Sequence, residues 1–509
     1  MRLTPSAPLP RLRVVPVACA VLAACGGGYG GGGSAPAVAP TIDLAVQPTT
    51  ITVGQDATIT WSASNATSCS ASGAWSGNEP TSGNMVVTPT AAGSATYTLT
   101  CTDMGTSPYG GGGSNSAKSV TLTVNAATVF VAKNLVADTA SGTVTVDTHL
   151  VNPWGISFGP GPAWVANNHS DTSTLYDGAG APQPAGSPLI VNLPPGTGGV
   201  SFDPTGIIFN PTTDFVVSAG GKSAAALFIY AGEGGMLAGW SKDVDVSNAV
   251  VMYTDAGGAV YKGLALADNG SGHFLYVTDF HNNKVDVFNS TFTKQPSSAT
   301  SFTFKDPALP AGYAPFGIQA LKNGAGGAVQ IYVAYAKQLG PDNHDNANGA
   351  GLGLVDIYDT NGKFLKTLVM PGGALNAPWG IALAPADFGT LSNLLLVGNF
   401  GDGKINGYDP NNGNFMGTLS TANGAFAAPG LWGIAFGNDA ANQPHNTLFF
   451  AAGRTTKPTA ATAASTCHDE RASKTARPET FALSAGPRPD LRQAKPREAE
   501  TRCHDQTTN

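Results

Sequence analysis

A short phrase centred on glycine recurs six times between residues 152 and 434, and it constrains the fold more than any other feature. In each copy the glycine precedes Ile or Leu, and the intervals between successive glycines are 51, 57, 54, 63 and 53 residues. A repeat of about 50 residues fits one four-stranded blade of a β-propeller better than a helical repeat. Six copies therefore predict six blades. The phrases read NPWGI (152–156), DPTGI (203–207), YKGLA (261–265), APFGI (314–318), APWGI (377–381) and GLWGI (430–434).

Strand patterns between the phrases support this interpretation. Stretches such as KVDVFN (284–289) and LVDIYD (354–359) alternate apolar and polar residues, which indicates strands with one buried face. Glycine lacks a Cβ and lets two backbones approach closely, so we expect the six glycines to crowd around a common axis. A ring of sheets needs closure, because an open sheet edge promotes aggregation. We predict that segment 129–138 completes the last blade as its outer strand.

Composition favours an all-β chain and excludes one class of partner. Apolar residues make up 42% and charged residues 12%, with 65 Gly and 36 Pro. Between residues 41 and 453 there are 13 Lys, no Arg and 26 Asp plus Glu, so the formal charge is 13 − 26 = −13. An acidic segment without arginine is poorly suited to phosphate groups, so we expect no nucleic-acid partner.

The first 24 residues have the pattern of a secretory signal peptide. A basic start without acidic residues precedes the apolar run 14–24, which is too short to span a bilayer. The run ends in LAAC (22–25), which resembles a bacterial lipoprotein cleavage box. That resemblance implies lipidation of Cys25 and an envelope location, at the outer membrane with a periplasmic or surface face, because Gly26 follows rather than Asp. Ordinary secretion is the alternative. Residues 25–40 then read as a glycine-rich tether.

Residues 41–125 predict a small β-sandwich. Five alternating stretches are separated by turn residues, and Cys69 and Cys101 lie 32 residues apart, which suggests one disulfide in an exported protein. Trp61 and Trp75 are alternative core aromatics. The segment resembles bacterial immunoglobulin-like domains, although Tyr97 lies four residues before the second cysteine rather than two. Such domains act as spacers or bind ligands.

Residues 128–453 resemble a known family. FLYVTDFHNNKVDVF (274–288) is similar to an NHL-type repeat, and phrases such as LNAPWGIALAP and LLVGNFGDGKINGYD resemble an uncharacterised family of exported bacterial six-bladed propellers. The resemblance implies a fold and an export route, with no established reaction. The expected architecture is all-β, with an immunoglobulin-like sandwich followed by a six-bladed propeller.

We expect one face of the propeller to carry the site. The phrases and the loops between the second and third strands share a face if the strands run outward from the axis. The candidate ligand contacts from the phrases are Trp154, Lys262, Phe316, Trp379 and Trp432. The residues expected to end the second strands are Asn167, Ala219, Asp279, Tyr335, Asn399 and Ala452. Aromatic rings around polar groups suit a concave ligand site, whereas Asn and Asp at these positions equally suit turns. Lys262 is either an anion contact or a cation stacked on a tryptophan.

Candidate catalytic and metal-binding groups are few. Asp279 with His281 is one candidate acid–base pair, and His169 is another candidate. The loop 340–349 contains Asp342, His344 and Asp345, whose oxygens could bind Ca²⁺, although the loop lacks the spacing of an EF-hand. A solvated loop is the alternative. No H-E-x-x-H, G-x-S-x-G, P-loop or CxxC motif is present.

The tail, residues 454–509, changes character. It contains seven Arg, where the preceding 413 residues contain none. It reads as a disordered tail or as the product of a frameshift. Members of the resembled family continue here with a strand similar to PNDEANGLYGRI, and suitable codons for residues 454–465, moved by one base, encode PNDEANGCYGRI. On that hypothesis the sixth blade loses its third strand. Resequencing tests it: an unchanged reading frame in a tail shared by relatives would contradict it.

These observations predict a lipid-anchored envelope protein whose propeller binds a carbohydrate, a small molecule or a protein, or acts as a scaffold. The alternative is a metal-dependent enzyme similar to gluconolactonase or to related propeller hydrolases and lyases. Those enzymes need a Glu/Asp/Asn cluster at the axis, and the expected second-strand ends supply one Asp and two Asn but no Glu. A purely structural envelope protein is the third possibility.

Overall fold

The computed structural model describes residues 38–103, 114–125, 130–140, 144–298, 300–322 and 327–453, and the backbone of 480–481. The predicted signal peptide, Cys25, the tether up to residue 37, and most of the tail lie outside these ranges. The chain divides into two compact units, Met1–Ala126 and Ala127–Asn509. In the described parts, helix is limited to three short 3₁₀ turns, so no helix there could cross a bilayer. The turns are η1 (Asn168–Ser170), η2 (Thr197–Gly199) and η3 (Gly389–Leu391).

The first unit consists of two sheets that share one core. Apolar side chains from both sheets pack around the disulfide between Cys69 and Cys101, which confirms the predicted bond. Trp61 and Trp75 both enter this core, with ring centroids 5.2 Å apart. One sheet has the order β1 (Thr41–Gln47), β3 (Ala57–Ser64), β6 (Ser82–Val87). The other has the order β2 (Thr50–Thr52), β8 (Asn115–Asn125), β7 (Gly93–Thr102), β4 (Ser68–Gly73), β5 (Gly77–Glu79).

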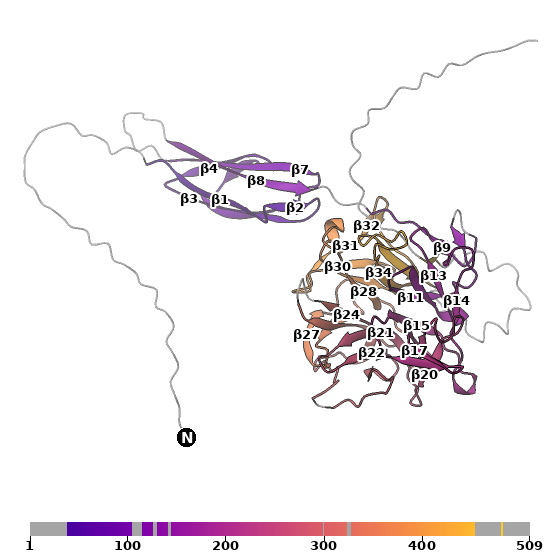
Figure 1. Ribbon diagram of the computed structural model, residues 1–509. Helices are drawn as coiled ribbons and strands as arrows, with labels where there is room; N and C mark the ends of the chain where they lie inside the picture. The colour runs from indigo at the N-terminus through magenta and orange to yellow at the C-terminus, as the bar shows by residue number, and fades with distance from the viewer. Residues whose placement is uncertain are drawn as a thin grey trace, which may run out of the picture. The chain divides into compact units, whose positions relative to one another are not determined.

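The second unit is a propeller of six sheets, whose first strands lie innermost (Figure 1). Sheet 1 contains β11 (Pro153–Phe158), β12 (Ala163–Asn167), β13 (Thr172–Tyr176) and β14 (Ile190–Asn192). Sheet 2 contains β15 (Pro204–Phe209), β18 (Phe228–Gly232), β19 (Met236–Trp240) and β20 (Val250–Thr254). Sheet 3 contains β21 (Tyr261–Asp268), β22 (His273–Asp279) and β23 (Lys284–Phe288). Sheet 4 contains β24 (Tyr313–Lys322), β25 (Val329–Lys337), β26 (Leu354–Tyr358) and β27 (Phe364–Val369). Sheet 5 contains β28 (Pro378–Leu383), β29 (Leu395–Asn399), β30 (Ile405–Tyr408) and β31 (Phe415–Thr418).

The sixth sheet joins distant segments of the chain. Its order is β34 (Leu431–Phe436), β35 (Leu448–Ala452), β36 (Thr480–Phe481), β9 (Val136–Ala137), β10 (Thr145–Val146). The prediction that segment 129–138 adds an outer strand to this blade is confirmed for β9. The third strand is β36, two residues of the tail, where the other blades have four or five residues in that position. The expected loss of this strand is therefore partial.

Two short hairpins complete the unit, and one of them corrects a prediction. The hairpins are β16 (Val216–Ala219) with β17 (Lys222–Ala225), and β32 (Ser420–Thr421) with β33 (Gly424–Ala425). The sequence assigned Ala219 to the end of the second strand of blade 2, and that assignment is wrong. The hairpin β16–β17 is an insertion, and the residue paired with Pro204 at the start of the phrase is Gly232 in β18.

The six glycines of the phrases form a closed ring. A Cβ built on each glycine would collide with the phrase of the next blade, and the sixth collides with the first. The nearest backbone contacts are Gly155 to Thr205 O at 2.6 Å, Gly206 to Leu264 N at 2.8 Å, Gly263 to Phe316 O at 3.0 Å, Gly317 to Trp379 O at 1.9 Å, Gly380 to Trp432 O at 2.5 Å and Gly433 to Trp154 O at 2.6 Å. Five of these distances are shorter than real Cβ atoms show and that of Gly263 is at the limit, so close packing favours glycine at all six positions, as predicted. We call these residues the hub glycines.

Candidate functional site

Two positions of each blade meet on one side of the hub glycines, and we call this surface the hub mouth. One position precedes the hub glycine: Trp154, Thr205, Lys262, Phe316, Trp379 and Trp432. In each blade, one residue of the second strand pairs with the residue two before the hub glycine. The other position is the residue immediately after that second-strand residue: Asn168, Glu233, Phe280, Ala336, Phe400 and Gly453. Contacts between blades that are not neighbours place this set at the axis. Trp154 of blade 1 and Trp379 of blade 5 have ring centroids 6.2 Å apart.

Aromatic side chains fill one side of the hub mouth. Trp432 stacks on Trp154 with ring centroids 3.4 Å apart and on Phe400 at 4.2 Å, and it lies 5.8 Å from Phe316 of blade 4. None of the three tryptophans exposes more than 9% of its surface. The predicted aromatic contacts are thus brought together, but their ring faces pack on one another. Contact between these rings and a ligand remains a prediction.

The opposite side of the hub mouth contains a buried ion pair. The Nζ of Lys262 donates a hydrogen bond to Oε1 of Glu233, and the two residues are 1% and 7% exposed. The same ammonium lies 5.2 Å from the ring centroid of Trp154 and 5.9 Å from that of Phe280, so two aromatic faces also stabilise its charge. Asn168 Nδ2 donates to the other carboxylate oxygen of Glu233 at 3.2 Å. The alternative of a lysine stacked on tryptophan thus agrees with the structure.

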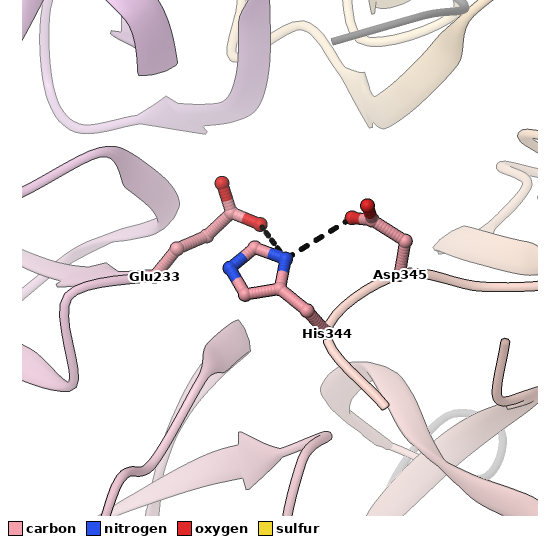
Figure 2. A group of neighbouring side chains, drawn as sticks. All are labelled: Glu233, His344 and Asp345. Carbon is pink, nitrogen blue, oxygen red and sulfur yellow. Dashed lines mark hydrogen bonds and ion pairs between the residues drawn. The ribbon is translucent and has the colours of Figure 1, made fainter. Parts of the chain in front are cut away.

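A loop of blade 4 brings two further titratable groups to this pair. His344 Nδ1 lies 3.8 Å from Glu233 Oε1 and 3.2 Å from Asp345 Oδ1 (Figure 2). The hydrogen bond from His344 lowers the pKa of the Asp345 carboxyl, and the nearby charge of Lys262 lowers that pKa further. One donor atom from each of Glu233, His344 and Asp345 lies within 4.8 Å of the others. Among the described residues, this is the group whose geometry could accept a metal ion.

The polar network continues into blade 1. Asn152 Nδ2 donates to Asn168 Oδ1 at 3.0 Å and lies 3.2 Å from His169 Nε2. Because Asn168 in turn contacts Glu233, the predicted residue His169 is connected to the ion pair through two amides. His169 is therefore placed at the edge of the hub mouth.

Two predicted ligand contacts, Asn167 and Asn399, form hydrogen bonds at the ends of their strands. Asn167 and Asn399 are fully buried at the ends of their second strands. Asn167 Nδ2 donates to Thr172 Oγ1 at 3.1 Å, and Asn399 Nδ2 donates to Asp402 Oδ1 at 3.0 Å and to Ala374 O at 2.9 Å. These bonds match the turn alternative, in which Asn fixes its own loop.

The predicted pair of Asp279 and His281 is not brought together by any hydrogen bond in the described structure. Asp279 is fully buried and accepts hydrogen bonds from Asn282 within its turn, with Lys284 Nζ at 3.3 Å. His281 Nδ1 instead donates to the backbone oxygen of Asp342 at 2.8 Å. Asp342 thus contributes to the loop's position and is not one of the grouped donors.

Tyr335 lies within blade 4 and away from the hub mouth. It is 2% exposed, and its hydroxyl group is 2.6 Å from that of Tyr358, which donates to Asp356 Oδ2 at 3.2 Å. Burial and the neighbouring Asp356 carboxylate raise the pKa of Tyr335 well above its usual value. This residue therefore belongs to a buried polar cluster of the blade.

The sequence interpretation missed Glu233. Its blade contains the inserted hairpin β16–β17, so the sequence pattern places the second strand too early and leaves Glu233 in a loop. One signal was available, because Glu233 is the only glutamate between residues 128 and 453.

Comparison with known proteins gives relatives but no described activity. No family model matches the chain. The uncharacterised protein R648 of Acanthamoeba polyphaga mimivirus is 31% identical over 339 residues, which cover 64% of this chain and 78% of that protein. Protein L690 of the same virus is 29% identical over 313 residues, covering 60% of this chain and 75% of L690. These relatives are viral, whereas the resemblance implied bacterial proteins.

The similarity to solved structures is low. The Dos1 propeller has a TM-score of 0.33 with 12% identity and covers 63% of this chain and 70% of its own. The glutaminyl cyclase of Myxococcus xanthus has a TM-score of 0.29 with 12% identity and covers 56% and 91%. A protein of unknown function from Bacteroides thetaiotaomicron reaches 0.39 with 10% identity and covers 82% and 96%. Similarities of this size carry no functional information.

Proposed function

Since the chain belongs to the same family as uncharacterised protein R648 of Acanthamoeba polyphaga mimivirus, we propose that the part they share is a ligand-binding propeller. The first unit ends at residue 126, so an alignment of 339 residues lies mostly in the propeller. The ligand binds at the hub mouth, and the propeller acts as a binding head.

The buried pair of Lys262 and Glu233 carries this proposal. Removing two charges from water costs several kcal/mol per ion before their attraction is counted, so such a pair is weak evidence for stability. Here it lies at the axis, with His344 and Asp345 of another blade beside it. Four titratable groups from three blades thus converge on one point, which is typical of a binding site.

The ligand is polar and rich in hydroxyl groups, as a carbohydrate is. Ammonium, imidazole and carboxylate groups supply both donors and acceptors to such a molecule. Stacking of sugar rings on tryptophan contributes little in this arrangement, because the tryptophans at the hub mouth are packed against one another.

The alternative function is that of a metal-dependent hydrolase or lyase. One observation favours it, the grouping of Glu233, His344 and Asp345. A metal at such a group can act as a Lewis acid or lower the pKa of a bound water.

We test the binding role by retention of the purified full-length protein on an array of neutral, amino and acidic oligosaccharides. His344→Ala should lose at least tenfold in retention, because the partly exposed imidazole reaches the ligand first. His445→Ala is the matched control, since His445 interacts with Asp439 and Asp387, away from the hub mouth. Equal retention of both variants, or no retention of the wild-type protein, would contradict the proposal.

The amino-terminal part serves as an anchor and a spacer in this proposal. Cys25 carries lipid, residues 25–40 are a tether, and the first unit is an immunoglobulin-like spacer. The two sheets packed around one disulfide support that last assignment. The protein faces the periplasm or the cell surface from the outer membrane.

Cys25→Ser tests the anchor. We expect the wild-type protein to sediment with membranes and to incorporate labelled fatty acid, and the variant to lose both properties. Cys69→Ser is the control for replacing a cysteine with serine: it removes the disulfide and should leave sedimentation and labelling unchanged. Sedimentation of Cys25→Ser with membranes would exclude lipidation as the anchor.

A further inference from the structure

We propose that Glu233, His344 and Asp345 bind one divalent transition-metal ion, and that Lys262 neutralises Glu233 when the metal is absent. This inference rests on the proposed function, because it places the metal at the same hub mouth. It specifies a cofactor that the binding role by itself does not require.

The geometry needs only a small adjustment. His344 Nδ1 is 3.2 Å from Asp345 Oδ1 and 3.8 Å from Glu233 Oε1. Donor atoms that share a tetrahedral metal lie roughly 3–3.5 Å apart, given metal–ligand distances of about 2.1 Å. Two of the three donors are on one loop of blade 4, so a movement of that loop by about 1 Å closes the shell (Figure 2).

The donor types select the metal. An imidazole nitrogen with two carboxylates suits Zn²⁺ and its first-row neighbours, whereas Ca²⁺ takes oxygen ligands. The predicted Ca²⁺ loop therefore contributes two of its three residues, His344 and Asp345, to a site of a different kind. Three protein ligands leave a position open for water or for a ligand, as in catalytic rather than structural zinc sites.

Hydrogen bonds from neighbouring side chains orient Glu233, the buried metal-binding residue. Asn168 Nδ2 donates to Glu233 Oε2 at 3.2 Å, and Asn168 Oδ1 accepts from Asn152 Nδ2 at 3.0 Å, so one carboxylate oxygen is fixed and Oε1 faces the loop. Hydrogen bonds of this kind to a ligating carboxylate usually improve metal affinity.

Lys262 and the metal compete for the same atom. The ammonium contacts Oε1 of Glu233, the oxygen nearest to His344. When the metal takes that oxygen, the rings of Trp154 and Phe280 still face the ammonium at 5.2 and 5.9 Å. Removal of the lysine charge should therefore strengthen metal binding, a direction that a purely structural ion pair does not predict.

The experiment measures metal binding by the full-length protein after treatment with EDTA. Titration with Zn²⁺ by calorimetry should give one equivalent, and Co²⁺ should give a visible d–d spectrum. Glu233→Gln and His344→Ala should each weaken Zn²⁺ binding at least tenfold, and Lys262→Met should strengthen it at least tenfold. Because Glu233→Gln alters a buried residue, His344→Ala on the partly exposed loop remains decisive if that variant fails to fold.

A second group of side chains supplies the matched control. His445 Nδ1 lies 2.9 Å from Asp439 and its Nε2 lies 3.2 Å from Asp387, so it also combines imidazole with two carboxylates, but on the surface. His445→Ala should leave Zn²⁺ binding unchanged. Loss of the bound equivalent in this variant, or no equivalent in the wild-type protein, would overturn the metal proposal.

The two proposals fail separately. Retention on the oligosaccharide array in the presence of EDTA, abolished by His344→Ala, supports the binding role and overturns a metal requirement. Zn²⁺ binding with the expected variant pattern, but no retention of any oligosaccharide with or without Zn²⁺, supports the metal site and rejects a carbohydrate ligand.

Discussion

Replacing Gly317 with alanine should prevent the propeller from closing. A Cβ at this position would lie 1.9 Å from the carbonyl oxygen of Trp379 and 2.7 Å from its carbonyl carbon. These are backbone atoms of the next inner strand, so no rotamer change relieves the collision. We expect a loss of about 4 kcal/mol or more in the free energy of unfolding, at the upper end for single substitutions. Urea denaturation of the full-length protein, followed by tryptophan fluorescence, measures it.

Gly373→Ala is the control for this prediction. A Cβ on Gly373 meets nothing within 4 Å, so its replacement should change the free energy of unfolding by less than about 0.5 kcal/mol. If both variants unfold at the same urea concentration, the hub glycines are not required for close packing of the inner strands.

Replacing Asp356 with asparagine should stabilise the protein at alkaline pH. Burial is the main reason that the pKa of this carboxyl rises to about 7, and the charge of Asp306 raises it further. The unfolded chain ionises near pH 3.8, so the folded state loses stability as the pH rises from about 4 to 7. Three pKa units correspond to about 4 kcal/mol, which the variant should regain at pH 8 and not at pH 4. Urea midpoints at the two pH values measure this difference.

Asp286→Asn is the matched control, because Asp286 has the same position in blade 3. Each aspartate pairs with a second-strand valine, Asp286 with Val277 and Asp356 with Val333. Asp286, however, has Lys284 at 2.8 Å and Lys294 at 2.6 Å. Its neutralisation should therefore destabilise the protein at pH 8. Destabilisation by Asp356→Asn at pH 8 would show that its carboxylate is stabilised in the fold.

The ring of blades could be predicted from the sequence because its determinant is local. The inner strand of the next blade leaves little room for a Cβ at each hub glycine. Glycine therefore recurs at every contact between neighbouring blades. The glycines at Gly155 and Gly433 thus predict the contact between the first and last blades, and this prediction does not depend on the sequence between them. The disulfide between Cys69 and Cys101 could likewise be predicted, from the spacing of the two cysteines within a predicted β-sandwich.

The site was less accessible to sequence reasoning because it depends on contacts across the axis. Lys262 of blade 3 could contact either a ligand or a side chain of another blade. The structure shows contact with Glu233 of blade 2, and the repeat does not specify that contact. The tryptophans follow the repeat, but Trp432 also packs on Phe400 and Phe316 of other blades, which the repeat does not specify. One inserted hairpin was enough to hide Glu233, since it shifted the strand assignment of a whole blade.

The sixth sheet has a consequence for biosynthesis. Its strand β9 is made before the other five sheets and its strands β34, β35 and β36 after them, so this sheet stays incomplete until the ribosome has released residue 481. Contacts between such remote segments slow folding, and nascent sheets meanwhile present free edges. Truncation within the last blade should therefore leave β9 without a partner strand and the ring of sheets unclosed, although β9 lies near the other end of this unit's sequence.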